Sequence, residues 1–225
     1  MTRGRLILSA LLLTVVAAPA AAQFAPHRYQ IGARLGTMRY DKSSGIDNGP
    51  LLGVDGTYFL NANIGIGFML DVAKPQTKGE FFPAELTFGD TTFLYLVSQP
   101  LTVVQVGAQV VGRIPMGNIA PYVALGAGWY RFFLDPQVSN GPKSFTHPML
   151  NFAAGLNIRL GESSGLRFEV RDFVHTDFDR SRLNPVGVRF QPTRFPDTII
   201  PPEAPKTRTN NIQLALAFSF IPGGQ

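Results

Sequence analysis

The chain has 225 residues and a formal net charge of +5, and only 16% of its residues are charged. This fraction is well below the roughly 25% that soluble domains carry, so much of the surface is expected to face something other than water. The basic excess is mild and scattered, which argues against a nucleic-acid partner. Cysteine is absent, so a single domain of this length must be held together by hydrogen bonds and packing rather than by disulfides.

Residues 1–22 have the pattern of a secretory signal peptide. Two arginines provide a basic start, the apolar stretch 6–18 follows, and three alanines at 20–22 offer an A-x-A cleavage site. The apolar stretch is shorter than the roughly 20 residues that a membrane-spanning helix needs. We therefore expect this segment to be removed and residues 23–225 to be exported as one mature domain.

Beyond the signal, apolar and polar residues alternate with period two, the pattern of half-buried β-strands. For example, Ile64, Ile66 and Phe68 alternate with two glycines. In chain order, the expected strands cover residues 29–40, 51–60, 64–72, 101–114, 122–133, 149–160, 166–174 and 210–220. The fourth strand is open to an extension back through residues 93–97. None of the 18 prolines falls inside these eight segments, as expected because proline cannot donate to a strand ladder.

The connections between these strands alternate in length. The main long connections are 74–100, 134–148 and 175–209, and the short turns are 61–63, 115–121 and 161–165. In an exported chain that starts in the periplasm, the long loops then lie outside the cell, as in bacterial outer-membrane barrels. No segment after the signal reaches 18 consecutive apolar residues, so a closed barrel is the remaining way to cross a membrane. The expected fold is all-β, an eight-stranded antiparallel up-and-down transmembrane β-barrel.

Three segments carry a resemblance to a known family. Residues 121–129 (PYVALGAGW) resemble the fifth-strand P-Y-x-x-x-G-x-G motif of the small OmpA-type outer-membrane barrels. Residues 166–171 (LRFEVR) are similar to the L-R-x-E-x-R strand of that family, and residues 212–220 to its closing strand, which ends in an aromatic residue. The resemblance covers residues 24–220 and implies an eight-stranded barrel of the bacterial outer membrane. Residues 221–225 trail past the terminal aromatic residue, and no peptidoglycan-binding domain follows, so the tethering role of full-length relatives is not carried over.

The same alternation also fits a soluble, lipocalin-like barrel with its apolar residues inside. The low charge, the absence of cysteine and the aromatic residues at strand ends favour the membrane interpretation, in which apolar residues face lipid. The aromatic residues expected in two girdles are Tyr29, Tyr58, Tyr122, Phe218 and Phe220 toward the periplasm, and Tyr40, Trp129, Tyr130, Phe132, Phe133 and Phe173 toward the outside.

With the apolar face outward, eight polar side chains are expected to converge on the lumen. They are Arg34, Asp55, Asp71, Gln105, Gln109, Arg113, Glu169 and Arg171. Buried charges must be paired, and an eight-stranded barrel is just wide enough for side chains to fill its interior. We therefore expect a paired, filled interior, with a polar path for ions or small solutes as the alternative.

One cluster of residues, at the outer end of the seventh expected strand, is a candidate for catalysis. His175, Asp177 and Ser181 lie where outer-membrane lipid A deacylases place a histidine and a serine, but the H-x-S-N arrangement of that family is absent. A nucleophile, a base and an orienting acid are needed together, so a solvated loop is the stronger interpretation. Asp177 and Asp179 fall far short of a calcium-binding loop. No metal, nucleotide or redox motif is present, and no cofactor is expected.

The long connection 175–209 is rich in proline, and a connection of this length is either functional or disordered. Its candidate contacts to lipopolysaccharide phosphates are Arg180, Arg182, Arg189 and Arg194. The expected partners are outer-membrane lipid, lipopolysaccharide and, during insertion, the barrel-assembly machinery, and we expect a monomer. The expected role is structural or one of surface interaction. A narrow conduit is the alternative, and a lipid A-modifying enzyme is a remote one.

Overall fold

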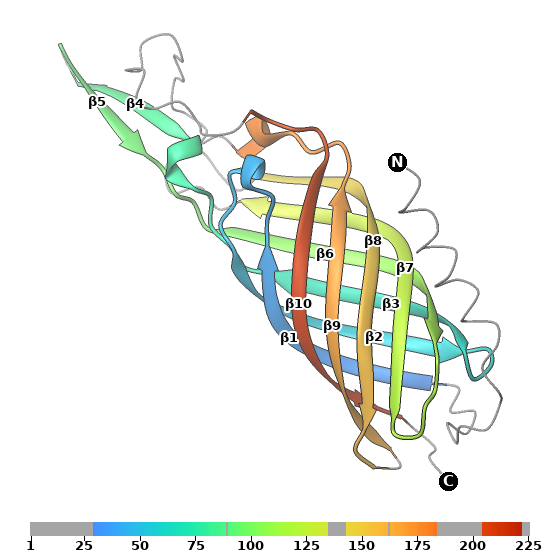
Figure 1. The fold of residues 1–225 in the computed structure, drawn as a ribbon. Helices are drawn as coiled ribbons and strands as arrows, with labels where there is room; N and C mark the ends of the chain where they lie inside the picture. Colours follow the sequence, from blue (N-terminus) through green and yellow to red (C-terminus); the bar gives the residue numbers. More distant parts are fainter. Residues whose placement is uncertain (1–28, 89, 135–142, 162, 184–203, 222–225) are drawn as a thin grey trace, which may run out of the picture.

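A computed structural model describes residues 29–88, 90–134, 143–161, 163–183 and 204–221. Eight antiparallel strands form a closed barrel (Figure 1). The strands are β1 (Tyr29–Arg39), β2 (Gly49–Phe59), β3 (Ile64–Ala73), β6 (Leu101–Arg113), β7 (Ile119–Leu134), β8 (Lys143–Arg159), β9 (Ser164–His175) and β10 (Thr209–Phe220). Each strand pairs with the next, and β1 closes the barrel against β10, where Ile31 pairs with Phe220. The predicted fold class is confirmed.

Three short turns join the strands at one end of the barrel, at residues 60–63, 114–118 and 160–163. The Asn61 side chain accepts hydrogen bonds from the backbone N–H groups of Asn63 and Ile64, both at 2.8 Å, so this turn is specified by the asparagine side chain. Gly117 supplies the positive φ of 61° that the second turn requires. The long connections gather at the opposite end, as the sequence predicts.

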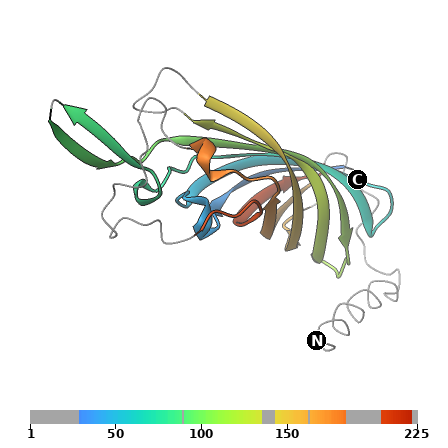
Figure 2. The same cartoon turned by 90° about the horizontal axis from the view of Figure 1, so that it is seen from above.

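The long connection 74–100 contains a sheet of its own. Strands β4 (Pro83–Phe88) and β5 (Thr91–Leu96) make a separate two-stranded sheet that projects beyond the barrel as an arm (Figures 1 and 2). The suggested extension of the fourth barrel strand back through residues 93–97 is therefore wrong. The chain leaves the barrel wall at Pro100, which forms an isolated bridge with Gln76, and the residues before it pair within the arm instead.

The largest extensions beyond the predicted strands are in β7 and β8, because proline does not end either strand. Pro121 lies inside β7 opposite Leu156, and Pro148 lies inside β8 opposite Trp129. Both prolines keep their carbonyl bonds, since Pro121 O accepts from Ile114 N–H at 2.9 Å and Pro148 O accepts from Thr176 N–H at 3.3 Å. The connection expected over 134–148 shrinks accordingly, and residues 135–142 lie outside the described part of the chain.

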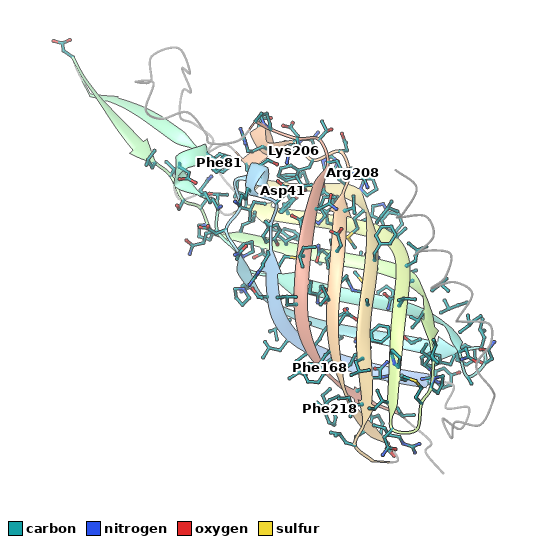
Figure 3. The ribbon with its side chains drawn as sticks, viewed as in Figure 1. Asp41, Phe81, Phe168, Lys206, Arg208 and Phe218 are labelled. Atoms are coloured by element: carbon teal, nitrogen blue, oxygen red, sulfur yellow. The ribbon has the colours of Figure 1, made fainter. Side chains whose placement is uncertain are left out.

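The outward face of the barrel is apolar. The outward positions with large exposed side chains include Ile31, Leu35, Leu52, Val54, Ile66, Phe68, Val110, Val123, Leu125, Phe152, Phe168, Val170, Leu216 and Phe218. Figure 3 shows Phe168 and Phe218 at the lower part of the wall. Among the barrel-strand residues whose side chains the structure describes, the charged outward ones are Arg39, Arg131 and Asp172, all within three residues of the strand end that meets the long loops. An uncharged outer belt with polar residues inside is the arrangement of a membrane barrel.

No helix within the described ranges is long and apolar enough to cross a membrane. The helical segments found there are three 3-10 turns, η1 (Lys42–Ser44), η2 (Gly79–Phe81) and η3 (Arg180–Leu183), and all three lie in the long connections. The expected signal peptide falls in residues 1–28, outside the described part.

Candidate functional site

Six charged residues in the middle of the barrel form ion pairs with one another. We call them the central network: Arg34, Asp55, Asp71, Arg167, Glu169 and Arg171. Arg34 Nε lies 2.8 Å from Asp71 Oδ1, and its Nη1 lies 3.3 Å from Glu169 Oε1. Arg171 Nε lies 2.9 Å from the same glutamate oxygen. All six residues are buried. Three guanidinium groups face three carboxylates, so the formal charges balance, as burial requires.

The network crosses the lumen because its members come from separate walls. Arg34 stands on β1, Asp55 on β2 and Asp71 on β3, whereas the other three stand on β9. Arg167 donates to both carboxylate oxygens of Asp55, a bidentate pair that links β9 to β2. Arg171 Nη1 reaches Gln109 Oε1 on β6 at 2.6 Å. These side chains fill the width of the barrel.

The predicted lumen set left out Arg167 and two further residues that complete this layer. Tyr122 donates to Glu169 Oε2 at 2.5 Å, and Asn151 Oδ1 accepts from Arg171 at 2.5 Å. The Tyr122 ring lies over Gly155 of the neighbouring strand, where an added Cβ would overlap Phe168 O and lie 2.6 Å from the tyrosine ring. A glycine is needed there because a side chain would collide with the backbone of β9 and displace the ring.

A second layer, the outer plug, closes the end that carries the long loops. It is an apolar cluster of Met38, Tyr40, Ile46, Leu51, Met69, Ala73, Phe81, Phe82, Leu101, Val103, Tyr130, Phe132, Leu134, Met149, Phe173, Phe178 and Leu183, with Phe145 against it. Strand residues contribute from below, and Ile46, Phe82 and Leu183 contribute from the loops. The loops therefore fold into the mouth of the barrel rather than standing open above it.

Polar contacts fasten these loops to one another. Gln99 Nε2 donates to Leu183 O at 3.0 Å, and Arg180 Nη1 donates to Ser43 O at 2.9 Å. Lys206 Nζ lies 3.6 Å from Asp41 Oδ1, and Figure 3 shows this pair beside the outer end of the barrel. Residues from three connections, β1 to β2, β3 to β6 and β9 to β10, thus contact one another over the end of the barrel. We call this group of loop segments the lid.

Of the eight predicted lumen residues, the structure brings six into the central network or its hydrogen bonds: Arg34, Asp55, Asp71, Gln109, Glu169 and Arg171. Gln105 lies nearer the outer end, where its Nε2 is 3.1 Å from His175 Nε2. Arg113 lies at the short-turn end, with its guanidinium carbon 3.4 Å from the Phe59 ring centroid and its Nε donating to Ala62 O. All eight are buried.

The aromatic girdles are only partly where they were expected. Tyr29, Trp129, Phe133, Phe218 and Phe220 are exposed on the outer wall, and Tyr58 packs against Tyr29 with ring centroids 5.0 Å apart. Tyr122 and Tyr130 instead point inward and are 6% and 0% exposed. The placement of these two tyrosines in the girdles was wrong, as it was for Tyr40, Phe132 and Phe173. The four that lie on strands occupy inward-facing positions of the alternation, and Tyr40, just after β1, is buried in the loops.

The candidate catalytic residues are not brought together. His175 is buried and stacks on Tyr130 with ring centroids 3.8 Å apart. Ser181 Oγ donates to Asp179 Oδ1 at 2.6 Å, and Asp177 pairs with His147 Nδ1 at 3.0 Å. The groups needed for nucleophilic attack are therefore engaged with different partners. Within the described residues, no cluster of three metal-ligating side chains occurs.

Two of the candidate lipopolysaccharide contacts, Arg180 and Arg182, lie within the described part, and both contact other residues of the lid. Arg180 lies over Phe81, with its guanidinium carbon 4.9 Å from the ring centroid. Arg182 Nη1 lies 2.9 Å from His147 Nε2 and its Nε lies 3.6 Å from Asp179 Oδ2. Arg189 and Arg194 lie outside the described residues.

A model of the outer membrane protein beta-barrel domain family matches residues 8–220. The chain belongs to this family of outer-membrane β-barrel proteins. No protein of curated function matches its sequence. Among solved structures, the Neisserial surface protein A matches with a TM-score of 0.54 at 12% identity, over 86% of this chain and 96% of that one. At such identity, the likeness speaks for the fold alone.

Two further solved structures are more distant. OprG from Pseudomonas aeruginosa matches with a TM-score of 0.47 at 14% identity, over 85% of this chain and 94% of that one. The outer membrane protease OmpT from Escherichia coli matches with a TM-score of 0.39 at 4% identity, over 89% of this chain and 99% of that one. Membership of the family places this barrel in the outer membrane. Its role has to be inferred from the residues of its own interior and loops.

Proposed function

We propose that this outer-membrane barrel has a structural or surface-interaction role and that its lumen does not conduct. The observation that carries the proposal is the double closure of the interior. The charge-balanced central network fills the middle of the barrel, and the outer plug fills its mouth. An ion would have to displace paired guanidinium and carboxylate groups and then cross a layer of packed aromatic and aliphatic side chains, which costs far more than thermal energy supplies.

A sealed barrel leaves the loop-bearing end as the part that can act on the surroundings. The lid exposes Lys42, Arg182 and Lys206 there, and the arm of β4 and β5 extends beyond it. These cations support contact with lipopolysaccharide phosphates as the surface interaction. Insertion by the barrel-assembly machinery and a monomeric state in lipid complete the proposal.

A conduit for ions or small solutes is the alternative, and a liposome flux assay separates the two. Liposomes loaded with a chloride-sensitive dye are prepared with the folded protein, and halide entry is followed after mixing. Our proposal predicts the same entry rate as in protein-free liposomes. A variant that lacks both closures, Arg34→Ala with Phe82→Ala and Leu183→Ala, is the positive control for detection, provided that it still shows the heat-dependent gel shift of a folded barrel. Flux through the wild-type protein would favour the conduit.

The remote enzymatic alternative has its own test. Lipid A mass spectra from cells with and without the protein should be identical under our proposal, since the histidine, serine and carboxylates of the outer end do not form one site. A spectrum that differs by one acyl chain would support lipid A modification instead.

A further inference from the structure

We propose that the outer wall of β3, β6 and β7 carries a binding site for the phosphorylated headgroup of an outer-leaflet glycolipid. The site is a cavity of about 600 Å³ lined by Lys74, Pro75, Gln76, Pro100, Leu101, Thr102, Phe133 and Leu134. It is distinct from the lid contacts and lies at the base of the arm. The inference rests on the proposed surface role and deepens it by giving contact with phosphorylated lipid a defined place on the barrel wall.

The cavity lies where the apolar belt ends. Thr102 and Phe133 pair across β6 and β7 on the outward face, and Val104 and Arg131 form the next outward pair toward the membrane. Below these, Val106 pairs with Trp129, which is 61% exposed. The wall therefore changes from apolar to polar within two residue pairs, at the level that interfacial aromatic residues occupy. A molecule seated there would place its headgroup in the cavity and its acyl chains on the belt beneath.

The charge of this site favours an anion. Lys74 is exposed, and its ammonium group has no ion pair or side-chain hydrogen bond with the residues that the structure describes. Arg131 lies over the Phe133 ring, with its guanidinium carbon 4.8 Å from the centroid, and its Nη2 donates to Ser144 Oγ at 2.9 Å. The one acidic residue on the outward face of the described strands, Asp172, stands on β9 and not on this wall. Two cations thus flank the cavity, and none of the residues that line it carries a carboxylate.

The occupant must combine phosphate with hydrocarbon. Lys and Arg form charge-assisted hydrogen bonds with phosphate oxygens, and Gln76 and Thr102 add neutral donors beside them. Phe133 provides an apolar surface for the ring or chain that carries the phosphate. A zwitterionic phospholipid brings its own cation and would gain less from Lys74 and Arg131. A phosphorylated glycolipid carries acyl chains and phosphates on one headgroup. Its phosphates can bind Lys74 and Arg131 while its acyl chains lie against the apolar belt.

Trp129 is the single tryptophan of the chain and stands two residues from Arg131 on the same outward face, so it reports on this wall directly. The protein is reconstituted into vesicles of brominated phosphatidylcholine, which quench its fluorescence. Bisphosphorylated lipid A is then added in increasing mole fraction. Lipid A that occupies the site displaces brominated lipid from Trp129, and fluorescence recovers at a lipid A fraction well below that expected from random mixing.

The variant Lys74→Gln/Arg131→Gln should shift the midpoint of recovery to about tenfold higher lipid A, the loss expected for two charged hydrogen bonds in partial contact with water. The matched control, Arg39→Gln/Arg208→Gln, removes the same charge from the same rim, at the end of β1 and just before β10, and should shift the midpoint less than about twofold. Lipid A stripped of its phosphates should give no recovery beyond random mixing.

Three results would overturn the proposal. These are recovery at random-mixing fractions in the wild type, equal shifts in the two variants, and equal recovery with phosphatidylglycerol, which would indicate simple attraction of anionic lipid to a basic rim. Each variant is checked for its heat-dependent gel shift, so an unfolded barrel is recognised. Halide flux in the same vesicles reports separately on the sealed lumen, so failure of the lipid site and failure of the proposed function are distinguishable.

Discussion

Arg167 on β9 and Asp55 on β2, which lie 112 residues apart in the chain, form a bidentate pair across the barrel interior. The pair ties together strands that are not neighbours in the sheet, since β10 and β1 stand between them. Backbone hydrogen bonds hold adjacent strands of a barrel, but they do not fix its cross-section. Pairs of this kind do, and they also fill the space through which a solute would pass.

Removal of one partner of this pair should be costly. Asp55→Ala leaves the Arg167 guanidinium buried without its carboxylate, and we expect the free energy of unfolding to fall by about 3–5 kcal/mol. The double variant Asp55→Ala/Arg167→Leu should recover a large part of this loss because no unpaired charge remains. Urea unfolding in lipid vesicles, followed by Trp129 fluorescence, measures both. A loss below about 1 kcal/mol in the single variant would mean that the pair is not buried as described.

Gly53 and Gly56 on β2 provide a matched test of how tightly the central network is packed. A Cβ added at Gly53 would overlap the Asp71 carboxylate and lie 2.9 Å from Arg34 Nε, whereas one added at Gly56 meets nothing within 4 Å. Gly53→Ala should therefore destabilise the barrel by about 1–3 kcal/mol through overpacking. Gly56→Ala should be neutral or slightly stabilising, since glycine is unfavourable within a strand. Equal effects in the same unfolding assay would contradict this packing.

The outer plug should depend on Phe82, a fully buried residue of the long connection 74–100. Phe82→Ala leaves a void among packed aromatic side chains and should loosen the lid without unfolding the barrel. Thr77 N–H donates to Gln99 O, and Lys78 N–H donates to Gly45 O, so these two amides report on the lid. We expect their hydrogen exchange to accelerate by at least about tenfold, the factor that corresponds to 1.4 kcal/mol. Leu60→Ala, at an exposed short-turn position, is the control that should leave them unchanged.

The lid should also loosen at low pH. The Ser181 hydroxyl that donates to Asp179, opposed by partial burial, holds the pKa of this carboxyl below its ordinary value. For Asp41, partial burial acts to raise the pKa, but the hydrogen bonds from Ser43 outweigh it and the pKa is lowered. A carboxyl with a lowered folded-state pKa stabilises the fold above its unfolded pKa of about 3.9, and this contribution is lost as the pH falls through the folded value.

Amide exchange of Ser43 and Ser181 measures this effect, because each backbone N–H donates to the carboxylate in question. Below about pH 4, their protection should decline faster than that of barrel amides. Asp41→Asn and Asp179→Asn should each remove the pH-dependent part at their own serine only. Protection that stays constant down to pH 2 would show that the two carboxylates do not hold the loops.

Strand parity predicted most of the wall and much of the interior from the sequence. Arg167 and Asn151 had the inward parity of their strands, so the alternation could have placed both in the lumen set. Tyr122 and Tyr130 were misplaced because a general preference of aromatic residues for strand ends was given more weight than parity. Tyr130 alternates with Trp129, and only one of two successive residues can face lipid.

The lid could not be predicted in this way. Its loops have no periodic pattern, and their contacts join distant segments, as in the Gln99 to Leu183 hydrogen bond. The approach of Phe82 and Leu183 to the barrel mouth depends on the width of the mouth and on which strand residues point into it. That information exists only after the barrel has closed. The cavity beside Lys74 likewise depends on the arm of β4 and β5, whereas the sequence left residues 93–97 open as an extension of the fourth strand.

The most direct test of the sealed lumen is the single-channel record of the folded wild-type protein in a planar bilayer. Heat-modifiable protein is inserted from detergent, and current is recorded in 1 M KCl across a range of voltages. Our account predicts no defined conductance step at any voltage, because the central network and the outer plug both close the path. A reproducible step of fixed size, retained after repurification of the folded form, would contradict the account and favour the conduit.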